Sequence, residues 1–360
     1  MDSNEAFDGF PLILGWELTL ECNLRCGHCG AAAGIPRQRE LSTDEALALC
    51  DQLPHLLVQE VDFTGGEPLL RPDWPLLAER LRDHDITVRV VTNGTLLNER
   101  TIGLLKETGV AGVGVSIDGL GATHDAIRGS KGLYDGVMAS VERTIAAGLP
   151  LTVITGVHPC NLHELAEMMY ELLAVGVRNW RLQPILPLGR AISGGIRFRL
   201  TERGYLEFGA FVRKWGPRAR AEGMVMRTGD AFGYFTELDD AEPPWRGCPA
   251  GLISCGITSD GGIKGCLSLP DELIEGSVRE RDLWDLWFNP ESFAYNRKFS
   301  SVAPDSLCAD CDRSDQCRGG CNAMSYANTG MFHNDSYCFY GIKTRWADGT
   351  EHPAFQNECC

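Results

Sequence analysis

Residues Thr19 to Gly34 read TLECNLRCGHCGAAAG, and this stretch decides how the rest of the chain is interpreted. Its three cysteines, Cys22, Cys26 and Cys29, are separated by three and two residues and follow an apolar run. A structural tetrahedral metal site takes four protein ligands, and a disulfide takes two cysteines. Three thiols therefore indicate either a fourth ligand far away in the chain or a coordination position left open for a group that is not protein.

The first half of the chain alternates apolar, β-branched segments with segments of helical spacing. The apolar segments read LILGWELTL, VDFTGG, TVRVVTNG, GVGVSIDG, LTVITGV and NWRLQPI. Successive strand-then-helix units predict a parallel sheet with helices outside it, either a barrel, complete or incomplete, or a doubly wound sheet. Helix starts are predicted at Ser42 and Asn161, because Glu45 and Glu164 follow at the spacing of a capping box.

Polar and glycine residues follow these predicted strands. Gly65, Gly66 and Glu67 come after the second strand and Asn93 comes after the third. Ser116 and Asp118 end the fourth strand, and Gln183 ends the sixth. Active sites of parallel α/β folds gather where strands end, so we expect these residues on one rim with the three cysteines. Taken singly, each is also compatible with an ordinary turn or strand end.

Composition limits the classes of protein to which the chain can belong. A chain of 360 residues with 44% hydrophobic content predicts two domains or one large α/β barrel with an extension. The net charge of −16 without a compensating Lys/Arg run predicts no nucleic-acid partner. The sequence contains no secretory signal and no apolar run of about 18 residues, which predicts a cytoplasmic protein without a membrane partner. In that reducing compartment, 15 cysteines indicate metal binding more than disulfides.

A second group of cysteines lies in the last third of the chain. It has eight members, enough for two complete sets of four ligands: Cys248, Cys255, Cys266, Cys308, Cys311, Cys317, Cys321 and Cys338. Paired Cys-x2-Cys groups also occur in zinc ribbons, so zinc is the alternative to iron–sulfur clusters on spacing alone.

The first cysteine triad, together with Gly-Gly-Glu-Pro after the second strand, resembles the radical S-adenosylmethionine (SAM) enzymes. The resemblance implies that the three thiolates hold three irons of a [4Fe-4S] cluster, and that the fourth iron is open for the amino and carboxylate groups of SAM. An electron from the cluster would cleave SAM, and the resulting 5′-deoxyadenosyl radical would abstract a hydrogen atom from the substrate. The cofactor supplies this chemistry, while the protein orients the reactants.

The same resemblance implies the residues that bind SAM. Residues 65–67 would hold the methionine amino group, and Ser116 and Arg128 would hold the carboxylate or ribose of SAM. Asn93 is a candidate for the ribose or the substrate side. A surface salt bridge is the alternative for Arg128. His28 stands where an aromatic residue often precedes the last cysteine, and we do not expect it to be a ligand.

The later cysteines resemble the SPASM extension of radical SAM enzymes, which carries two auxiliary iron–sulfur clusters. Matching by position implies two sets. The first is Cys248, Cys255, Cys266 and Cys321; the second is Cys308, Cys311, Cys317 and Cys338. Fully ligated clusters are suited to electron transfer and to support of the fold. The expected cofactors are therefore three [4Fe-4S] clusters and SAM.

The resemblance extends over nearly the whole chain and implies its division into domains. We expect a partial (β/α)6 TIM-type barrel over residues 1–200, a bridging region over 201–245, a small cysteine-rich SPASM domain over 246–345 and a C-terminal tail over 346–360. The overall fold class is therefore α/β.

Four cysteines stand outside the expected clusters. Cys50 lies in an amphipathic helix and is predicted to be core. Cys160 is either a packed thiol or, near a helix start, a hydrogen-atom donor of the kind that epimerases of this superfamily use. Cys359 and Cys360 are predicted to lie in a mobile tail.

The branch of the superfamily bears on the substrate. Sulfatase maturases carry an Asp directly after the cysteine that corresponds to Cys266, where this chain has Leu267. WELTLECNLRCGHC resembles the peptide-maturase branch, which includes the mycofactocin, pyrroloquinoline quinone and sactipeptide maturases. We therefore predict an oxidoreductase that crosslinks or otherwise modifies a ribosomally synthesised precursor peptide. Alternatives are an enzyme acting on a sugar or nucleoside, an anaerobic sulfatase-type maturase, and a metal-binding scaffold without activity.

The expected partners follow from this function. Only 21 residues precede Cys22, too few for the peptide-recognition domain that many maturases carry, so we expect a separate peptide-recognition protein. An electron donor such as flavodoxin or ferredoxin is expected as well. The bond that is formed and the oligomeric state do not follow from the sequence.

Overall fold

The structure is a computed structural model that describes residues 9–193, 198–234 and 246–347. The predicted tail from residue 348 onward, with Cys359 and Cys360, lies outside the described residues. The chain divides into two compact units. The first comprises Met1–Asn23, Ala33–Gly114 and Pro249–Ser300, and the second comprises Leu24–Ala32, Val115–Cys248 and Ser301–Cys360.

The first unit is built on a sheet whose strand order is β10-β9-β8-β1-β2-β3. The bounds are β1 Ile13–Thr19, β2 Glu60–Gly65, β3 Thr87–Thr92, β8 Ser254–Ile257, β9 Gly262–Lys264 and β10 Gly276–Ser277. Strand β1 pairs in parallel with β2 on one side and with β8 on the other, while β9 and β10 continue in antiparallel pairs. Segments more than 200 residues apart in the chain are therefore direct neighbours in one sheet.

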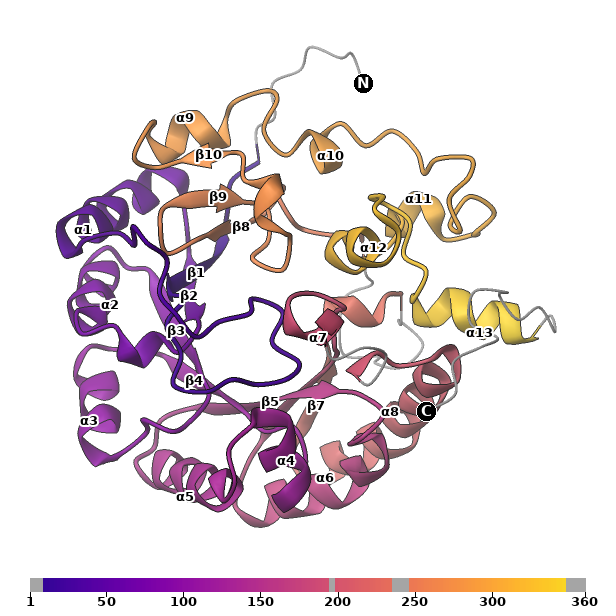
Figure 1. The fold of residues 1–360 in the computed structure, drawn as a ribbon, viewed down its shortest axis with the longest axis horizontal. Coiled ribbons are helices and arrows are strands. Elements are labelled where there is room, and N and C mark those ends of the chain that lie inside the picture. The colour runs from indigo at the N-terminus through magenta and orange to yellow at the C-terminus, as the bar shows by residue number, and fades with distance from the viewer. Residues whose placement is uncertain (1–8, 194–197, 235–245, 348–360) are drawn as a thin grey trace. The chain divides into compact units, whose positions relative to one another are not determined.

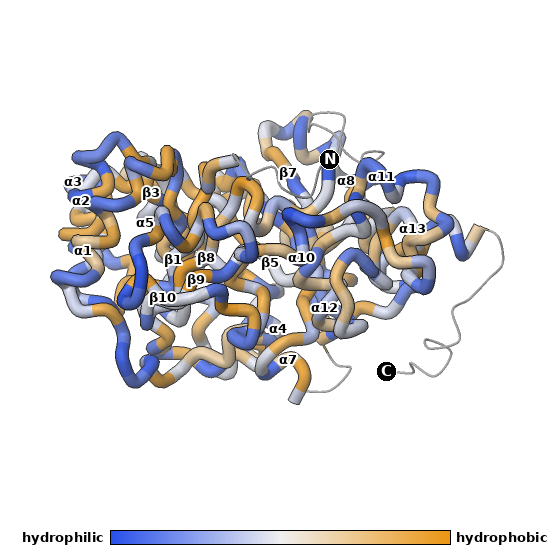
Figure 2. The backbone as a smooth tube through the Cα atoms, turned by 90° about the horizontal axis from the view of Figure 1, so that it is seen from above, coloured by the Kyte–Doolittle hydropathy of each residue, from blue (hydrophilic) through white to orange (hydrophobic). Residues whose placement is uncertain are grey.

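The helices of the first unit, apart from α10, lie along the outer side of these strands (Figure 1). They are α1 Thr43–Gln52, α2 Trp74–Asp83, α3 Glu99–Glu107, α9 Leu283–Trp287 and α10 Ala294–Arg297, with short 3-10 turns at Leu53–Leu56, Pro68–Leu70 and Asp271–Leu273. In Figure 2, apolar and hydrophilic stretches alternate along α1, α2 and α3, as expected of helices that bury one face. The capping box predicted at Ser42 and Glu45 is confirmed.

Apolar side chains of β1 and β2 form the core of the first unit. Trp16 is fully buried and packs edge-on against Phe63, with ring centroids 5.9 Å apart. Strand β1 also carries one buried carboxylate, Glu17, whose partners are described with the site.

The second unit continues the same strand-then-helix pattern. Strand β4 (Gly112–Ser116) leads into it, and β5 (Leu151–Val157), β6 (Asn179–Pro184) and β7 (Val225–Thr228) pair in parallel in that order. Its helices are α4 Gly121–Arg128, α5 Leu133–Ala146, α6 Leu165–Ala174, α7 Arg190–Ser193, α8 Glu202–Ala221, α11 Ser314–Cys317, α12 Asn322–Thr329 and α13 Phe339–Ala347, with 3-10 turns at Leu162–Glu164 and Asp230–Phe232. All six predicted strands are present, and the predicted α/β class is confirmed.

The structure adds one feature to the predicted fold and corrects another. The region predicted as a bridge contains the long helix α8 and a further parallel strand, β7, which pairs with β6. The capping box predicted at Asn161 is wrong, because no side-chain cap forms there. Asn161 is buried and donates to the carbonyl oxygens of Asp118 (3.0 Å) and Gly156 (2.7 Å). A buried amide makes these long-range bonds because its polar atoms must be satisfied away from water.

No helix in the described part of the chain is both long and apolar enough to cross a membrane.

Candidate active site

In the first unit, the first motif cysteine lies beside an amide side chain from the end of β3. Asn93 Nδ2 is 3.9 Å from Cys22 Sγ and also donates to Asn23 Oδ1 at 2.8 Å. The other end of the Asn93 amide accepts from the backbone and hydroxyl of Thr95 (3.0 and 2.6 Å). These bonds hold Asn93 with its N–H groups toward the thiol. Contact of Asn93 with ribose or substrate stays a prediction.

The glycines after β2 allow two chain segments to approach closely. A Cβ atom on Gly66 would lie 2.0 Å from the carbonyl oxygen of Glu21, and Gly65 has φ +127°, a backbone conformation that favours glycine. Gly66 N donates to Thr19 O, and Glu67 N donates to Glu21 O, both at 2.8 Å. The Gly-Gly-Glu turn is thereby fixed against the segment that leads into Cys22.

Glu67 is fully buried, and its carboxylate binds the protein itself. It accepts hydrogen bonds from Thr92 Oγ1 (2.8 Å), the backbone of Asn93 (2.8 Å) and the backbone of Leu69 (3.2 Å). Glu67 therefore positions the end of β3, and with it the amide that faces Cys22. Its contact with the amino group of SAM stays a prediction.

In the second unit, the second motif cysteine lies beside a buried ion pair. Arg128 Nη2 is 2.6 Å from Asp118 Oδ2, and Arg128 Nη1 lies 3.8 Å from Cys26 Sγ. Both charged residues are buried. Burial alone would raise the pKa of Asp118, but the positive charge of Arg128 holds it well below its usual range. Arg128 is thus a buried cation and not the surface salt bridge that was the alternative.

Two histidines complete this charged cluster. His28 Nε2 is 3.2 Å from Asp118 Oδ2, and His124 Nδ1 accepts from the Asp118 backbone at 3.1 Å. Burial lowers the pKa of each histidine to about 4, so each is neutral near pH 7. Within the described residues, His28 Nδ1 and Arg128 Nε are buried polar atoms without a hydrogen-bond partner. Such atoms beside Cys26 fit the binding of a polar cofactor there.

Arg190 of α7 fixes the backbone of the cysteine loop. Its Nε donates to the carbonyl oxygen of Cys26 at 2.8 Å, and its backbone N–H donates to the carbonyl oxygen of Cys29 at 3.0 Å. Arg190 could not be recognised from the sequence, because it lies more than 150 residues after the loop and outside any motif. Asp118 was expected on the rim with the cysteines, and His28 was noticed only for its place before Cys29.

Three further residues considered in the sequence analysis are Ser116, Cys160 and Cys50. Ser116 ends β4 and is half-buried. Cys160 is a half-buried free thiol whose backbone N–H donates to His158 Nδ1 at 3.2 Å. Its role as a hydrogen donor stays a prediction. Cys50 is buried in α1, and burial raises the pKa of its thiol to about 12, in agreement with a core cysteine.

The second auxiliary set, Cys308, Cys311, Cys317 and Cys338, lies entirely within the second unit. The Tyr234 backbone N–H lies 3.4 Å from Cys338 Sγ, and burial raises the pKa of the Cys308 thiol to about 11. Thiols this hard to ionise become ligands only when a metal replaces their protons. Four thiols and a backbone donor on sulfur fit an iron–sulfur cluster.

In the described part of the chain, no three His, Cys, Asp or Glu side chains lie close enough together to bind a single metal ion. The thiolates of a four-iron cluster each bind a different iron, so they lie farther apart than the ligands of one ion.

In the first auxiliary set, Cys255 and Cys266 belong to the first unit, while Cys248 and Cys321 belong to the second. A buried lysine, Lys264, binds the loop that follows Cys266. Lys264 Nζ donates to the carbonyl oxygen of Leu269 at 2.7 Å and pairs with Asp271 Oδ1 at 2.9 Å.

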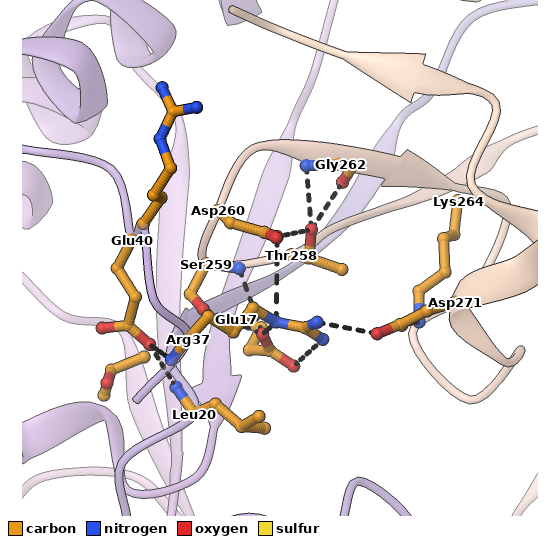
Figure 3. Close-up of polar contacts among 12 residues, drawn as sticks. Glu17, Leu20, Arg37, Glu40, Thr258, Ser259, Asp260, Gly262, Lys264 and Asp271 are labelled. Carbon is orange, nitrogen blue, oxygen red and sulfur yellow. Dashed lines mark hydrogen bonds and ion pairs between the residues drawn. The ribbon is translucent and has the colours of Figure 1, made fainter. Parts of the chain in front are cut away.

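A chain of charges joins this lysine to β1 (Figure 3). Arg37 Nη1 binds Asp271 Oδ2 at 2.7 Å, and Arg37 Nε binds Glu17 Oε1 at 2.6 Å. Glu17 also accepts from the backbone and hydroxyl of Ser259 (3.1 and 3.0 Å). The Cys266 loop is therefore anchored to the strand that leads into the first cysteine motif. This anchor was not predicted from the sequence, although a glutamate within an apolar strand was a signal of a buried polar contact.

We expect Lys264→Met to loosen the Cys266 loop. The substitution removes the donor to buried backbone oxygens, and an unsatisfied buried acceptor costs about 1–3 kcal/mol. The measurement is hydrogen exchange over residues 265–271 together with iron content, and both faster exchange and iron loss are expected. Lys298→Met is the control, because Lys298 pairs with Glu291 at the exposed surface and should change stability by less than about 1 kcal/mol. Equal exchange in the two variants would contradict the anchor.

Comparison with known proteins places this arrangement in a family. Residues 16–172 match the model of the radical SAM superfamily, and residues 248–312 match that of the iron-sulfur cluster-binding domain called SPASM. The chain is 31% identical over 358 residues to the AdoMet-dependent heme synthase of Methanosarcina barkeri, an alignment that covers 93% of this chain and 98% of that protein. The chain belongs to the radical SAM superfamily.

Further relatives support the SPASM branch of this superfamily. The mycofactocin maturase MftC of Mycobacterium tuberculosis is 29% identical over 325 residues, which cover 88% of this chain and 79% of that protein. The crystal structure of Streptococcus suis SuiB matches with a TM-score of 0.74 and 19% identity, over 92% of this chain and 77% of that chain. The predicted partial-barrel fold and the enzymatic nature of this radical SAM protein are thereby confirmed, and the SPASM match favours iron–sulfur clusters over zinc.

Proposed function

We propose that the chain holds a [4Fe-4S] cluster on Cys22, Cys26 and Cys29 and uses it to generate a 5′-deoxyadenosyl radical from SAM. The observation that carries the proposal is that two of these thiols have a side-chain N–H group within hydrogen-bonding distance of sulfur: Asn93 on Cys22 and Arg128 on Cys26. Donors to sulfur stabilise the thiolate that iron requires and tune a cluster's potential. When bound, the cluster supplies the electron that cleaves SAM.

The residues around the thiols have separate tasks in this proposal. Arg128 and Asn93 stabilise thiolate charge, Arg190 fixes the backbone of the cysteine loop, and Glu67 fixes the backbone of Asn93. The glycine carbonyls at positions 65 and 66, with Ser116, bind the polar end of SAM. Because the N–H groups of Arg128 and Asn93 are already held in place, they need no rearrangement when the charge at the site changes.

We also propose two auxiliary clusters, one on Cys248, Cys255, Cys266 and Cys321 and one on Cys308, Cys311, Cys317 and Cys338, which gives three in total. Removal of a hydrogen atom leaves a substrate radical, and loss of one further electron gives a closed-shell oxidised product. The cysteines of the two sets would hold clusters able to accept that electron. We also propose that the chain divides into its barrel, bridging and SPASM regions at about residues 200 and 246.

The first candidate substrate is a ribosomally synthesised precursor peptide, which the enzyme would crosslink or modify on a side chain. Its support is the similarity to the mycofactocin maturase over 88% of this chain. A separate peptide-recognition protein would raise the local concentration of such a flexible substrate. The proposal includes an electron donor such as flavodoxin or ferredoxin and a cytoplasmic location.

The second candidate substrate is a tetrapyrrole of the heme type. One observation favours it: the alignment with the heme synthase of Methanosarcina barkeri spans nearly the full length of both proteins. Abstraction of a hydrogen atom followed by loss of one electron would oxidise a tetrapyrrole side chain as well as a peptide side chain.

A direct comparison of substrates tests the function. Reconstituted protein with SAM and a reductant is expected to release 5′-deoxyadenosine, and the correct substrate should increase this release in proportion to product. The two arms are the peptide encoded beside this gene, with and without its neighbouring recognition protein, and an iron porphyrin that carries carboxylate side chains. Product masses identify the bond that changes.

Each outcome of this comparison has a defined meaning. Product from the porphyrin alone would replace the peptide proposal with the tetrapyrrole one. Turnover only of a free sugar or nucleoside would reject both. Absence of 5′-deoxyadenosine in every arm, with the clusters intact, would reject radical generation itself.

A further inference from the structure

The second half of α8 concentrates positive charge on an acidic protein. Residues 213–221 contain four cations, Arg213, Lys214, Arg218 and Arg220, and no carboxylate, although the whole chain has a net charge of −16. All four are exposed. This segment therefore carries a net positive charge on an acidic chain, and the exposed Glu222 follows it directly.

Aromatic rings lie beneath these cations. Trp215 of α8 and Tyr170 of α6 meet edge to face, with centroids 5.9 Å apart. The guanidinium of Arg218 lies 5.3 Å from the Trp215 ring and 5.9 Å from the Tyr170 ring, and Lys214 Nζ lies 5.0 Å from Trp215. Tyr170 is 46% exposed. We call Tyr170, Lys214, Trp215 and Arg218 the α8 patch; tryptophan, tyrosine and arginine are the residue types most enriched in binding hot spots.

Stability of the helix does not account for the patch. Cations in the last turn of a helix interact favourably with its dipole, which explains Arg218 and Arg220 but not Arg213 and Lys214 farther from the end. Gly216 and Pro217 also stand inside the helix. Glycine costs about 1 kcal/mol and proline about 3 kcal/mol in a helix interior. The sequence of this segment is therefore poor for helix stability and rich in exposed recognition groups.

A series of aromatic rings leads from the patch to the second auxiliary set. Trp215 contacts Phe211 (centroids 6.4 Å apart), and Phe208 lies one turn earlier on the same helix. Phe208 contacts Phe232 at 4.7 Å, and Phe232 stacks on Phe339 at 4.8 Å. Phe339 directly follows Cys338. Phe208 to Trp215 spans about 10 Å of helix.

We propose that the α8 patch is the docking surface of an acidic one-electron carrier protein that exchanges electrons with the cluster on Cys308, Cys311, Cys317 and Cys338. The inference rests on the proposed function, since that cluster belongs to it. The reduced cluster loses one electron and the carrier gains it; in a flavin carrier, the flavin also takes one proton from solvent. No other bond forms or breaks. Opposite charges on the two surfaces accelerate encounter, and this acceleration falls with ionic strength.

The test is electron transfer from the reduced, fully reconstituted enzyme to oxidised flavodoxin, followed in a stopped-flow instrument by semiquinone absorbance. The double variant Lys214→Glu/Arg218→Glu is expected to lower the second-order rate at least tenfold at low salt, and the difference from wild type should shrink at high salt. The control is Arg39→Glu/Arg100→Glu, which changes net charge equally at exposed positions of the first unit and should retain most of the rate. Reduction of a small uncharged quinone should be equal in all three proteins.

Other results would overturn the inference. Equal rates for the patch variant and the charge control, with the same salt dependence, would show that the patch does not dock the carrier. The inference would also be overturned if the patch variant lost binding to anionic vesicles or to an acidic precursor peptide while its electron-transfer rate to the carrier stayed unchanged. If quinone reduction also slows in the patch variant, the carrier rate of the neutral variant Lys214→Gln/Arg218→Gln is measured instead. A carrier rate of this variant equal to that of wild type would reject the proposal. Loss of the cluster signals from the wild-type enzyme would instead reject the proposed function.

Discussion

Cys26→Ala is expected to abolish SAM cleavage and to reduce the iron content of the protein by about four atoms from about twelve per chain. The motif supplies only three thiolates, so removal of one leaves too few ligands to hold a cluster with a single open iron. Cys26 also carries the contact with Arg128 (3.8 Å) and the carbonyl bond from Arg190 (2.8 Å). The measurements are 5′-deoxyadenosine formation, iron content and the electron paramagnetic resonance of the reduced protein.

Two variants make this result specific. Cys311→Ala should also lower iron content and should impair product formation, but it should leave SAM binding largely intact, because Cys311 belongs to an auxiliary set. Cys50→Ala removes a buried core thiol and should leave iron content unchanged. SAM cleavage at the normal rate by Cys26→Ala would show that the catalytic cluster has been placed on the wrong residues.

Asp118→Asn should destabilise the protein by about 3–5 kcal/mol, because it removes one partner of a buried ion pair and leaves Arg128 as an uncompensated buried charge. The Asp118 carboxylate also accepts from the backbone of Gly156 at 2.8 Å and faces His28. The measurement is the free energy of unfolding by denaturant without oxygen. Asp135→Asn makes the same chemical change at an exposed position and should cost no more than about 1 kcal/mol.

The same pair also predicts how stability depends on pH. Because the pKa of Asp118 is lower in the folded protein than in the unfolded chain, its contribution is fully present above about pH 4 and is lost as the pH falls below that value. The acid limb of the wild-type stability curve should therefore be steeper than that of Asp118→Asn. The double variant Asp118→Leu/Arg128→Met, which removes both charges, should be more stable than Asp118→Asn. Equal stability of Asp118→Asn and Asp135→Asn would contradict the buried pair.

Much of the fold could be predicted from short-range patterns in the sequence. The six strands were found because apolar, β-branched runs ending in turn residues are a short-range signal, and the capping box at Ser42 depends on residues three apart. The region around β7 was harder to interpret. That strand is short, with only one buried residue, and its place is set by pairing with β6, a long-range contact that periodicity does not encode.

The substrate was the least predictable feature. Motifs that hold a cofactor are conspicuous because iron and SAM constrain residue type and spacing, whereas a substrate pocket is built from side chains of many elements. Relatives named for heme synthesis and for mycofactocin maturation match the chain at 31% and 29% identity. The same radical chemistry thus accompanies different substrates.

The sequence by itself determined the spacing of Cys22, Cys26 and Cys29, the Gly-Gly-Glu turn and the order of the first six strands, since each depends on neighbours in the chain. The tertiary structure decided which charged side chains meet: Arg128 with Asp118 and Cys26, and Glu17 with Arg37 and Ser259. Glu17 and Ser259 lie 242 residues apart. A buried charge needs a partner, but only the packing of strands and loops selects which residue that partner is.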